Sequence, residues 1–158
     1  MRAGHQVEAL LLILSTWKFA RFRYALRSFR VDRFEQTLRR LEPTFRKFYR
    51  QDFATIDFDQ HTQDTKRLFT TLANIKGIEK TGAPKLMHLK VPRVFVMWDG
   101  AIRRHYGCRR GDAADYVMFL KLMQARFGTI RMRSERTLPK LIEEHNFLTI
   151  TRPMLGRQ

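Results

Sequence analysis

Apolar residues recur every three or four positions over most of the chain, which is the spacing of one helix face. In the stretch from 32 to 50, Asp32 and Glu35 form a capping-box pattern that predicts the start of a helix. Pro43 predicts a bend or a split within this helix. Its apolar positions are Phe34, Leu38, Leu41, Phe45 and Phe48, and its opposite face carries Arg39, Arg40, Arg46, Lys47 and Arg50.

The same spacing predicts further helices along the chain. They cover 7–16, a stretch that ends near Ile75, 116–127 and 138–145. Asp112 and Asp115 suit the start of the helix over 116–127, whereas the tail from 148 to 158 has no firm assignment. Strand-like alternation is scarce and Asn-Gly turns are missing. We therefore expect residues 1–158 to form one compact all-α domain.

The charge of the chain is strongly positive. There are 31 Lys and Arg residues against 15 Asp and Glu, which gives a formal net charge of +16. A folded domain this basic is typical of proteins that bind nucleic acid, because each neutralised phosphate releases condensed counterions. An acidic membrane surface, an acidic protein or simple solubility are the alternatives.

Cysteine and histidine usage argues against a metal centre. Cys108 is the single cysteine, which excludes an intrachain disulfide, a Cys-rich zinc site and a four-cysteine iron–sulfur cluster. The five histidines have no ligand-like spacing. The apolar run at 10–14 is too short to span a bilayer and lacks the features of a signal peptide. We expect no metal, no membrane association and a cytoplasmic location.

The segment from 72 to 86 predicts a hairpin of two helices that could bind phosphate. The first helix ends at Ile75, a tight turn follows around Gly77, and the second helix begins near 82–83. Ile78 can fill the gap between the helices, and the free N–H groups at the second helix start form an anion site. An ordinary turn between two helices is the alternative reading. Positive charge around the turn comes from Lys76, Lys80 and Lys85.

This segment resembles the helix-hairpin-helix motif of the HhH-GPD superfamily of base-excision DNA glycosylases. The motif reads Leu-Pro-Gly-Val-Gly, two variable residues and Thr-Ala, and the chain fills that frame without a gap over 75–83. By this resemblance the motif spans about 66–90. Lys76 replaces the proline, Glu79 the second glycine and Gly82 the threonine. A carboxylate at position 79 would repel a phosphate unless it turned away or paired with a lysine.

A second match lies downstream, over 97–104. Trp98-Asp99-Gly100-Ala101-Ile102-Arg103-Arg104 resembles the Val-Asp-Thr-His-Val/Ile-x-Arg segment of the endonuclease III branch. The resemblance implies that Asp99 is the catalytic carboxylate, and the alternative is a helix N-cap. Thr81 matches the Schiff-base lysine of bifunctional members, and its distance of 18 positions from Asp99 agrees with that branch.

The resemblance implies an enzyme that flips a damaged or modified base out of duplex DNA and excises it. An ionised Asp99 would stabilise positive charge on the sugar and assist an attacking water. Threonine at position 81 implies a monofunctional enzyme that leaves an abasic site, with Lys80 or Lys85 as alternative amines. Trp17 would be the wedge in the gap left by the base, or else a core residue. The expected DNA contacts are Lys76, Gly77, Ile78, Glu79, Lys80, Thr81, Gly82, Lys85, Arg103 and Arg104.

We therefore expect a minimal, monomeric member of the superfamily without an iron–sulfur cluster. No cofactor is expected, with a monovalent cation at the hairpin left open. The partner would be double-stranded DNA that carries a lesion or modified base. A non-catalytic helix-hairpin-helix DNA-binding protein is the main alternative, and a basic helical RNA-binding protein is the third. Which base is excised does not follow from the sequence.

Overall fold

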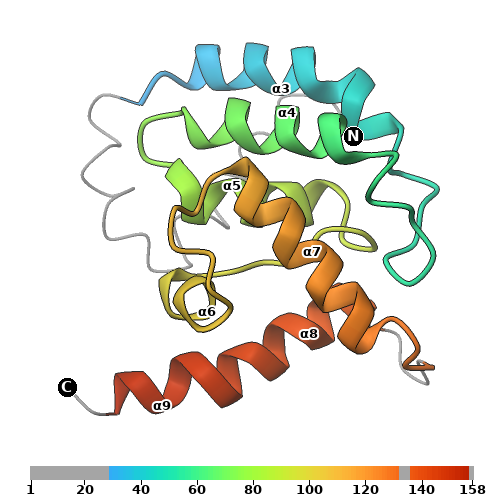
Figure 1. Cartoon of the computed structure of the whole chain (residues 1–158). Helices are drawn as coiled ribbons and strands as arrows, with labels where there is room; N and C mark the ends of the chain where they lie inside the picture. Colours follow the sequence, from blue (N-terminus) through green and yellow to red (C-terminus); the bar gives the residue numbers. More distant parts are fainter. Residues whose placement is uncertain (1–28, 132–135, 157–158) are drawn as a thin grey trace.

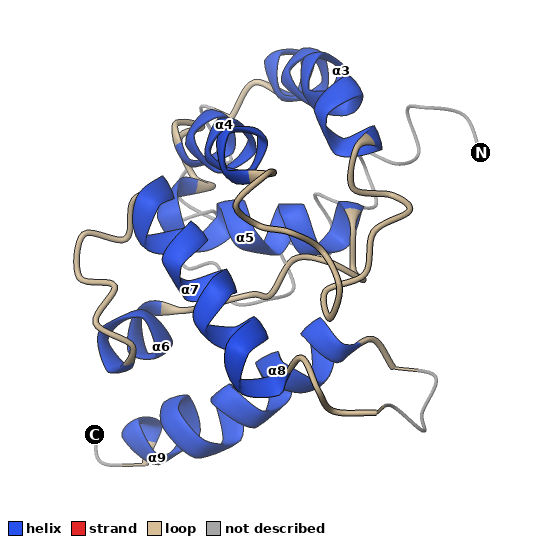
Figure 2. Cartoon of the chain, turned by 45° about the vertical axis from the view of Figure 1, so that its right-hand side comes forward, coloured by secondary structure: helices blue, strands red, loops and turns tan. Residues whose placement is uncertain are grey.

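The computed structural model describes residues 29–131 and 136–156, and within them every regular element is a helix (Figure 2). The prediction of an all-α fold is thereby confirmed for the described residues. The predicted helix over 7–16 and the predicted wedge Trp17 lie outside them. The elements are α3 (Val31–Arg46), α4 (Thr62–Ala73), α5 (Glu79–Lys90), α6 (Gly100–His105), α7 (Ala113–Phe127), α8 (Leu138–Asn146), the π-helix η2 (Phe147–Thr151) and α9 (Arg152–Leu155).

The helices form an upper stack and a lower rod (Figure 1). The upper stack consists of α3, α4 and α5, with α4 packed against both neighbours. Helix α7 crosses in front of the stack and packs on α4. Below it, α8, η2 and α9 continue one another as a single rod, and α6 packs against η2. A site between α5, α6 and the rod is thus assembled from segments far apart in the sequence.

Helix α3 shows where the helical pattern predicted correctly and where it failed. Its buried residues include the predicted Phe34, Leu38, Leu41 and Phe45. The predicted capping box is wrong, because the N-cap is Arg30 and no side chain caps this end. Asp32 lies in the first turn, where its Oδ2 accepts a hydrogen bond from Arg30 Nη2 at 2.9 Å. The flanking arginine thus engages the carboxylate that was expected to bond the helix backbone.

Several predicted boundaries also move. Pro43 lies inside α3, which continues to Arg46, so the predicted split does not occur. Helix α4 ends at Ala73, before Ile75, and α5 begins at Glu79, earlier than predicted. The tail from 148 onward, for which no element was predicted, forms most of η2 and all of α9.

Trp98 lies at the centre of the hydrophobic core. It is 1% exposed, and its ring meets Phe69, Tyr116 and Phe119 at centroid distances of 5.9, 5.0 and 5.3 Å. Packing of this kind fixes a large aromatic side chain in one orientation. The backbone on either side of Trp98, including Asp99, is held in place as a result.

The segment that leads to Trp98 is buried and has no regular secondary structure. Its buried carbonyl groups therefore need side-chain donors. The hydroxyl of Tyr116 donates to the Val96 carbonyl at 3.0 Å, and His88 Nδ1 lies 2.7 Å from the Phe95 carbonyl. A carbonyl only accepts, so Nδ1 carries a proton, and burial lowers the pKa of His88, which favours the neutral ring. These bonds satisfy the buried carbonyl groups of the segment that leads to Asp99, at the edge of the core.

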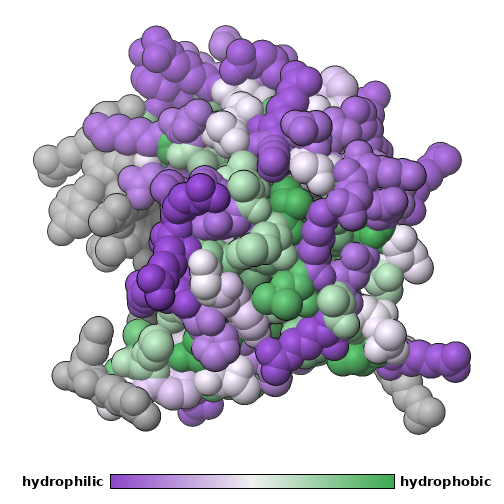
Figure 3. Space-filling view, viewed as in Figure 1, coloured by the Kyte–Doolittle hydropathy of each residue, from purple (hydrophilic) through white to green (hydrophobic). Residues whose placement is uncertain are grey.

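Polar and apolar surfaces separate on the face shown in Figure 3. Hydrophilic residues cover α3, and hydrophobic surface gathers over α7, where Met118 and Leu122 are exposed. Across residues 29–131 and 136–156, no helix combines the length and apolar character needed to cross a membrane.

Candidate active site

Asp99 is the N-cap of α6, and both oxygens of its carboxylate accept hydrogen bonds. Oδ1 accepts from the Ile102 backbone N–H at 2.8 Å, as expected for an N-cap. Oδ2 accepts from the Thr151 hydroxyl at 2.6 Å. The side chain is partly buried. Each carboxylate oxygen has two acceptor sites, so the group can bind a further donor such as water without losing either bond.

A pocket of about 220 Å³ opens beside this carboxylate. It is smaller than the roughly 300–1,000 Å³ of pockets for drug-sized ligands, so it suits a group such as one heterocycle. Four apolar side chains form part of its wall, and two lysines and two carboxylates supply its charge. The lining residues are Lys85, Met97, Trp98, Asp99, Ile102, Lys140, Glu143 and Phe147.

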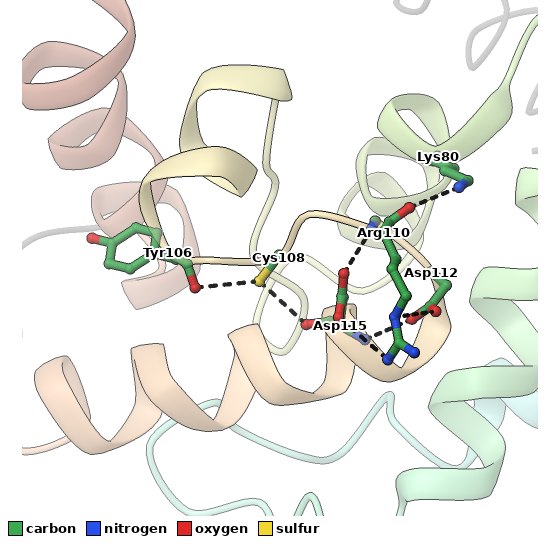
Figure 4. Close-up of polar contacts among 7 residues, drawn as sticks. Lys80, Tyr106, Cys108, Arg110, Asp112 and Asp115 are labelled. Atoms are coloured by element: carbon green, nitrogen blue, oxygen red, sulfur yellow. Dashed lines mark hydrogen bonds and ion pairs between the residues drawn. The ribbon is translucent and has the colours of Figure 1, made fainter.

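The two lysines considered as alternative amines have different surroundings. Lys85 of α5 lines the pocket together with Asp99. Burial lowers the pKa of Lys85, while the carboxylates of Asp99 and Glu143 oppose this shift. Lys80 is exposed, and its Nζ donates to the backbone carbonyl of Arg110 at 2.7 Å (Figure 4). Of the two, Lys85 is the one whose amine is brought to the pocket.

Helix α8 and the start of η2 supply pocket residues that the sequence analysis did not identify. Lys140 Nζ pairs with Glu143 Oε2 at 2.6 Å, and Phe147 is 40% exposed beside them. The helix over 138–145 was predicted, and a signal for its continuation exists, because Ile142, Asn146 and Ile150 follow one another at a spacing of four and are all buried.

Asn146 interrupts that apolar stripe in the sequence. A buried amide needs polar partners. It finds them in the Tyr106 hydroxyl, which donates to Oδ1 at 2.8 Å, and in Met123 Sδ, which lies 3.6 Å from Nδ2. Tyr106 lies in the turn that follows α6, and Met123 lies in α7. The sequence pattern alone therefore shows a polar residue where the structure has a core position.

A hydrogen bond links the pocket to the first turn of α5. The indole Nε1 of Trp98 donates to the Lys80 carbonyl at 2.9 Å. In a regular helix this carbonyl would accept from the N–H of residue 84, but that residue is Pro84, which has none. The proline thus leaves a free acceptor, and the residue next to Asp99 occupies it.

The turn between α4 and α5 has the backbone conformation that a tight connection requires. Gly77 has φ +92°, as predicted for a glycine there, and Ile78 is buried with 1% exposure. Glu79 has φ +53°, a left-handed conformation that is unfavourable for a residue with a side chain. It is also the position at which the sequence departs from the second glycine of the motif. The backbone there keeps a glycine-like conformation without the glycine.

The start of α5 leaves backbone donors available. The N-cap residue Ile78 makes no side-chain cap bond, and the N–H groups of Lys80 and Thr81 fall in the first turn, where a helix provides no acceptor. Of the predicted DNA-contacting residues around the turn, Lys76, Glu79 and Lys80 are exposed, Thr81 and Lys85 are partly buried, and Gly77, Ile78 and Gly82 are buried.

The two arginines predicted to contact DNA differ in their surroundings. The guanidinium of Arg103 lies over the Trp98 ring at 5.9 Å, against Gly111. Its Nε is buried and has no hydrogen-bond partner within the described part of the chain. Arg104 is exposed. Arg103 therefore packs against the core residue Trp98, whereas Arg104 is accessible to a partner molecule.

The loop between α6 and α7 is held by polar contacts (Figure 4). Gly111, with φ +59°, donates its N–H to Asp115 Oδ2 at 2.7 Å, and Asp112 caps α7 as predicted. Cys108 Sγ lies 3.6 Å from the Asp115 carbonyl, and burial raises the pKa of Cys108 to about 11. At neutral pH this favours the protonated thiol, which is a weaker nucleophile than the thiolate.

Among the described residues, no group of three or more His, Cys, Asp or Glu side chains is arranged to hold a metal ion.

Comparison with known families gives one match. The model of a family of unknown function, DUF6308, matches residues 11–145, which is most of the chain. The chain belongs to the DUF6308 family. No curated protein and no solved structure matches it. In this DUF6308 chain the matched span includes Asp99 and Glu143, whereas Phe147 and Thr151 lie beyond it.

Proposed function

We propose that this chain is a DNA glycosylase of the helix-hairpin-helix type, which flips a damaged or modified base out of duplex DNA and excises it. The observation that carries the proposal is the position of Asp99. Its carboxylate lines a pocket of about 220 Å³, and the preceding residue, Trp98, is hydrogen-bonded to the first turn of α5. A carboxylate at a pocket of this size is thereby linked to a helix start with free N–H groups.

The start of α5 supports binding to a DNA phosphate. Backbone N–H groups in an uncapped first turn, together with the helix dipole, favour an anion. Exposed Lys76 and Lys80 add positive charge beside it. The net charge of +16 supports a polyanionic partner. A phosphate bound here would bring the adjacent nucleotide toward the pocket.

The pocket supports cleavage of an N-glycosidic bond. As the bond breaks, positive charge develops on the sugar, and an ionised Asp99 beside it would stabilise the transition state. The same carboxylate can orient or deprotonate the attacking water. Phe147, 40% exposed in the pocket wall, offers a ring against which an extruded base can stack.

The proposal is tested with a panel of duplex oligonucleotides, each carrying one modified base. We expect strand breaks at one class of modified base, visible only after hot alkali cleaves the abasic product. Unmodified duplex is the control for contaminating nuclease. Duplex binding without excision anywhere in the panel would favour a non-catalytic DNA-binding protein. Preference for RNA over a duplex with an abasic analogue would favour an RNA-binding protein.

A second candidate is a bifunctional enzyme in which Lys85 attacks the sugar and the strand is then cut. Its support is the location of Lys85 in the same pocket as Asp99, where burial lowers the pKa of the amine. Desolvation of this kind favours the neutral, nucleophilic amine, which would attack the sugar carbon as the bond to the base breaks. Thr81 stands where bifunctional glycosylases of the resembled superfamily have their Schiff-base lysine. Threonine at this position favours the water mechanism instead.

Borohydride reduction during turnover separates the two mechanisms. Under water attack assisted by Asp99, we expect no covalent protein–DNA adduct, because no imine forms. An adduct that Lys85→Met abolishes and Lys80→Met leaves intact would assign the amine to Lys85. That result would contradict the monofunctional mechanism while leaving the glycosylase proposal in place.

Glu79→Gly is expected to raise both stability and DNA affinity. The positive φ at this residue is unfavourable for glutamate, so glycine should increase the free energy of unfolding by about 1 kcal/mol. Loss of the carboxylate should tighten duplex binding, measured by fluorescence anisotropy at fixed salt. Glu79→Gln is the matched control, since it removes the charge but keeps the strained backbone. Equal DNA affinity of all three proteins would show that position 79 does not face the phosphate.

A further inference from the structure

The C-terminal rod brings a hydroxyl group into contact with the proposed catalytic carboxylate. Thr151 Oγ1 donates to Asp99 Oδ2 at 2.6 Å, across 52 positions of sequence. Thr151 is the last residue of η2, a five-residue π-helix between α8 and α9. π-Helical turns are rare and are found frequently at functional sites.

One side of the rod faces the proposed active site. Glu143, Phe147 and Thr151 are spaced by four, so they follow one another along one helix face. The first two line the pocket, and the third bonds the carboxylate of Asp99. The neighbouring stripe of Ile142 and Ile150 is buried and anchors the rod. The hydroxyl is therefore part of a face that continues the pocket wall.

The second hydrogen bond has a specific physical effect on an aspartate. Rotation about the bond to the carboxyl group is only weakly restricted by the side chain itself. The Ile102 N–H holds Oδ1, which on its own leaves the carboxylate plane free to turn about that contact. The Thr151 hydroxyl holds Oδ2, and two contacts at different oxygens define the plane.

We infer that Thr151 is a positioning residue for Asp99, which fixes the carboxylate plane against the sugar and the attacking water. The inference rests on the proposed glycosylase function. It gives the rod a role in the reaction that is separate from binding, because Thr151 acts through Asp99 rather than on DNA. Reaction rates depend steeply on such geometry, and a misplacement of about 1 Å can cost on the order of 100-fold.

Thr151→Val tests the inference, because valine keeps the branched shape and removes the donor. We expect the single-turnover excision rate to fall by about 10–100-fold, with the dissociation constant for the same duplex unchanged. Thr151→Ser retains the hydroxyl and should recover most of the rate. Thr149→Val is the matched control on the same π-helix, since the Thr149 hydroxyl donates to the His145 carbonyl of α8, at 2.7 Å, and does not contact Asp99 in the described structure.

A double-mutant cycle separates positioning of Asp99 from general support of the fold. In an Asp99→Asn background, Thr151→Val should cause no further loss of excision, because the carboxylate on which it acts is gone. The two substitutions should also have non-additive effects on the urea-unfolding midpoint. This measures the contact between Thr151 and Asp99 independently of activity.

The outcomes distinguish the inference from the function on which it rests. Wild-type excision rates in Thr151→Val, or equal losses in Thr149→Val, would overturn the positioning role and leave the glycosylase intact. Additive effects of the two substitutions on the unfolding midpoint would likewise overturn the contact between Thr151 and Asp99. Wild-type protein without any excision that depends on Asp99 would overturn both the function and the role of Thr151.

Discussion

Asp99→Asn is expected to lower base excision by about 10²–10⁴-fold, the range contributed by a positioned acid–base group. Asparagine has nearly the same shape and is a good N-cap, so α6 should form as before. It carries no negative charge, however, and it cannot accept a proton from water. Affinity for duplex DNA should not fall, because the exchange removes a negative charge from the pocket that would receive DNA in the proposed complex. The measurements are single-turnover excision and equilibrium binding on the same oligonucleotide.

Asp112→Asn provides the control for this experiment. Asp112 is also a helix N-cap, and its side chain accepts from the Asp115 N–H at 2.9 Å, but it does not line the pocket. If both variants lost excision equally, the effect at Asp99 would reflect capping rather than chemistry. Full activity in Asp99→Asn would remove the carboxylate from the mechanism.

Trp98→Phe should cause the largest loss of stability among the changes considered, about 2–4 kcal/mol in the free energy of unfolding. The smaller ring leaves a cavity among Phe69, Tyr116 and Phe119. It also removes the indole donor and leaves the Lys80 carbonyl without its partner. Urea denaturation followed by circular dichroism measures the change.

Pro84→Ala separates the two contributions. Alanine restores an N–H that can bond the Lys80 carbonyl within α5, so it can replace the lost indole donor. In the Pro84→Ala background, Trp98→Phe should therefore cost about 1 kcal/mol less than in the wild type. Identical costs in the two backgrounds would show that the cavity accounts for the whole effect and that this hydrogen bond adds little.

Several parts of the site could be predicted because they depend on short stretches of sequence. Glycine at position 77 indicated a turn that needs positive φ, and the structure has φ +92° there. Asp99 and Asp112 were expected to start helices, and each accepts a backbone N–H three residues ahead. The same local logic failed at Asp32, because Arg30 two residues earlier competes for the carboxylate.

Other parts of the site could not be predicted because they depend on contacts between distant segments. Asn146 interrupts the apolar pattern of the C-terminal rod, and its burial is compensated by Tyr106 and Met123, which lie in distant segments of the chain. The helix over 138–145 was predicted, but nothing in its pattern indicated that Glu143 or the later Phe147 would line a pocket. Periodicity cannot reveal a buried amide whose partners lie elsewhere in the chain.

The sequence by itself determined the helical class, the hydrophobic faces, the glycine turn and the excess of positive charge, since these follow from spacing and composition over a few residues. Tertiary structure decided which side chains meet: that Trp98 bonds the carbonyl left free by Pro84, that Lys85 and Glu143 share a pocket with Asp99, and that Thr151 reaches its carboxylate. Packing directions of whole helices set these contacts, and residue spacing carries no information about the angle at which two distant helices pack.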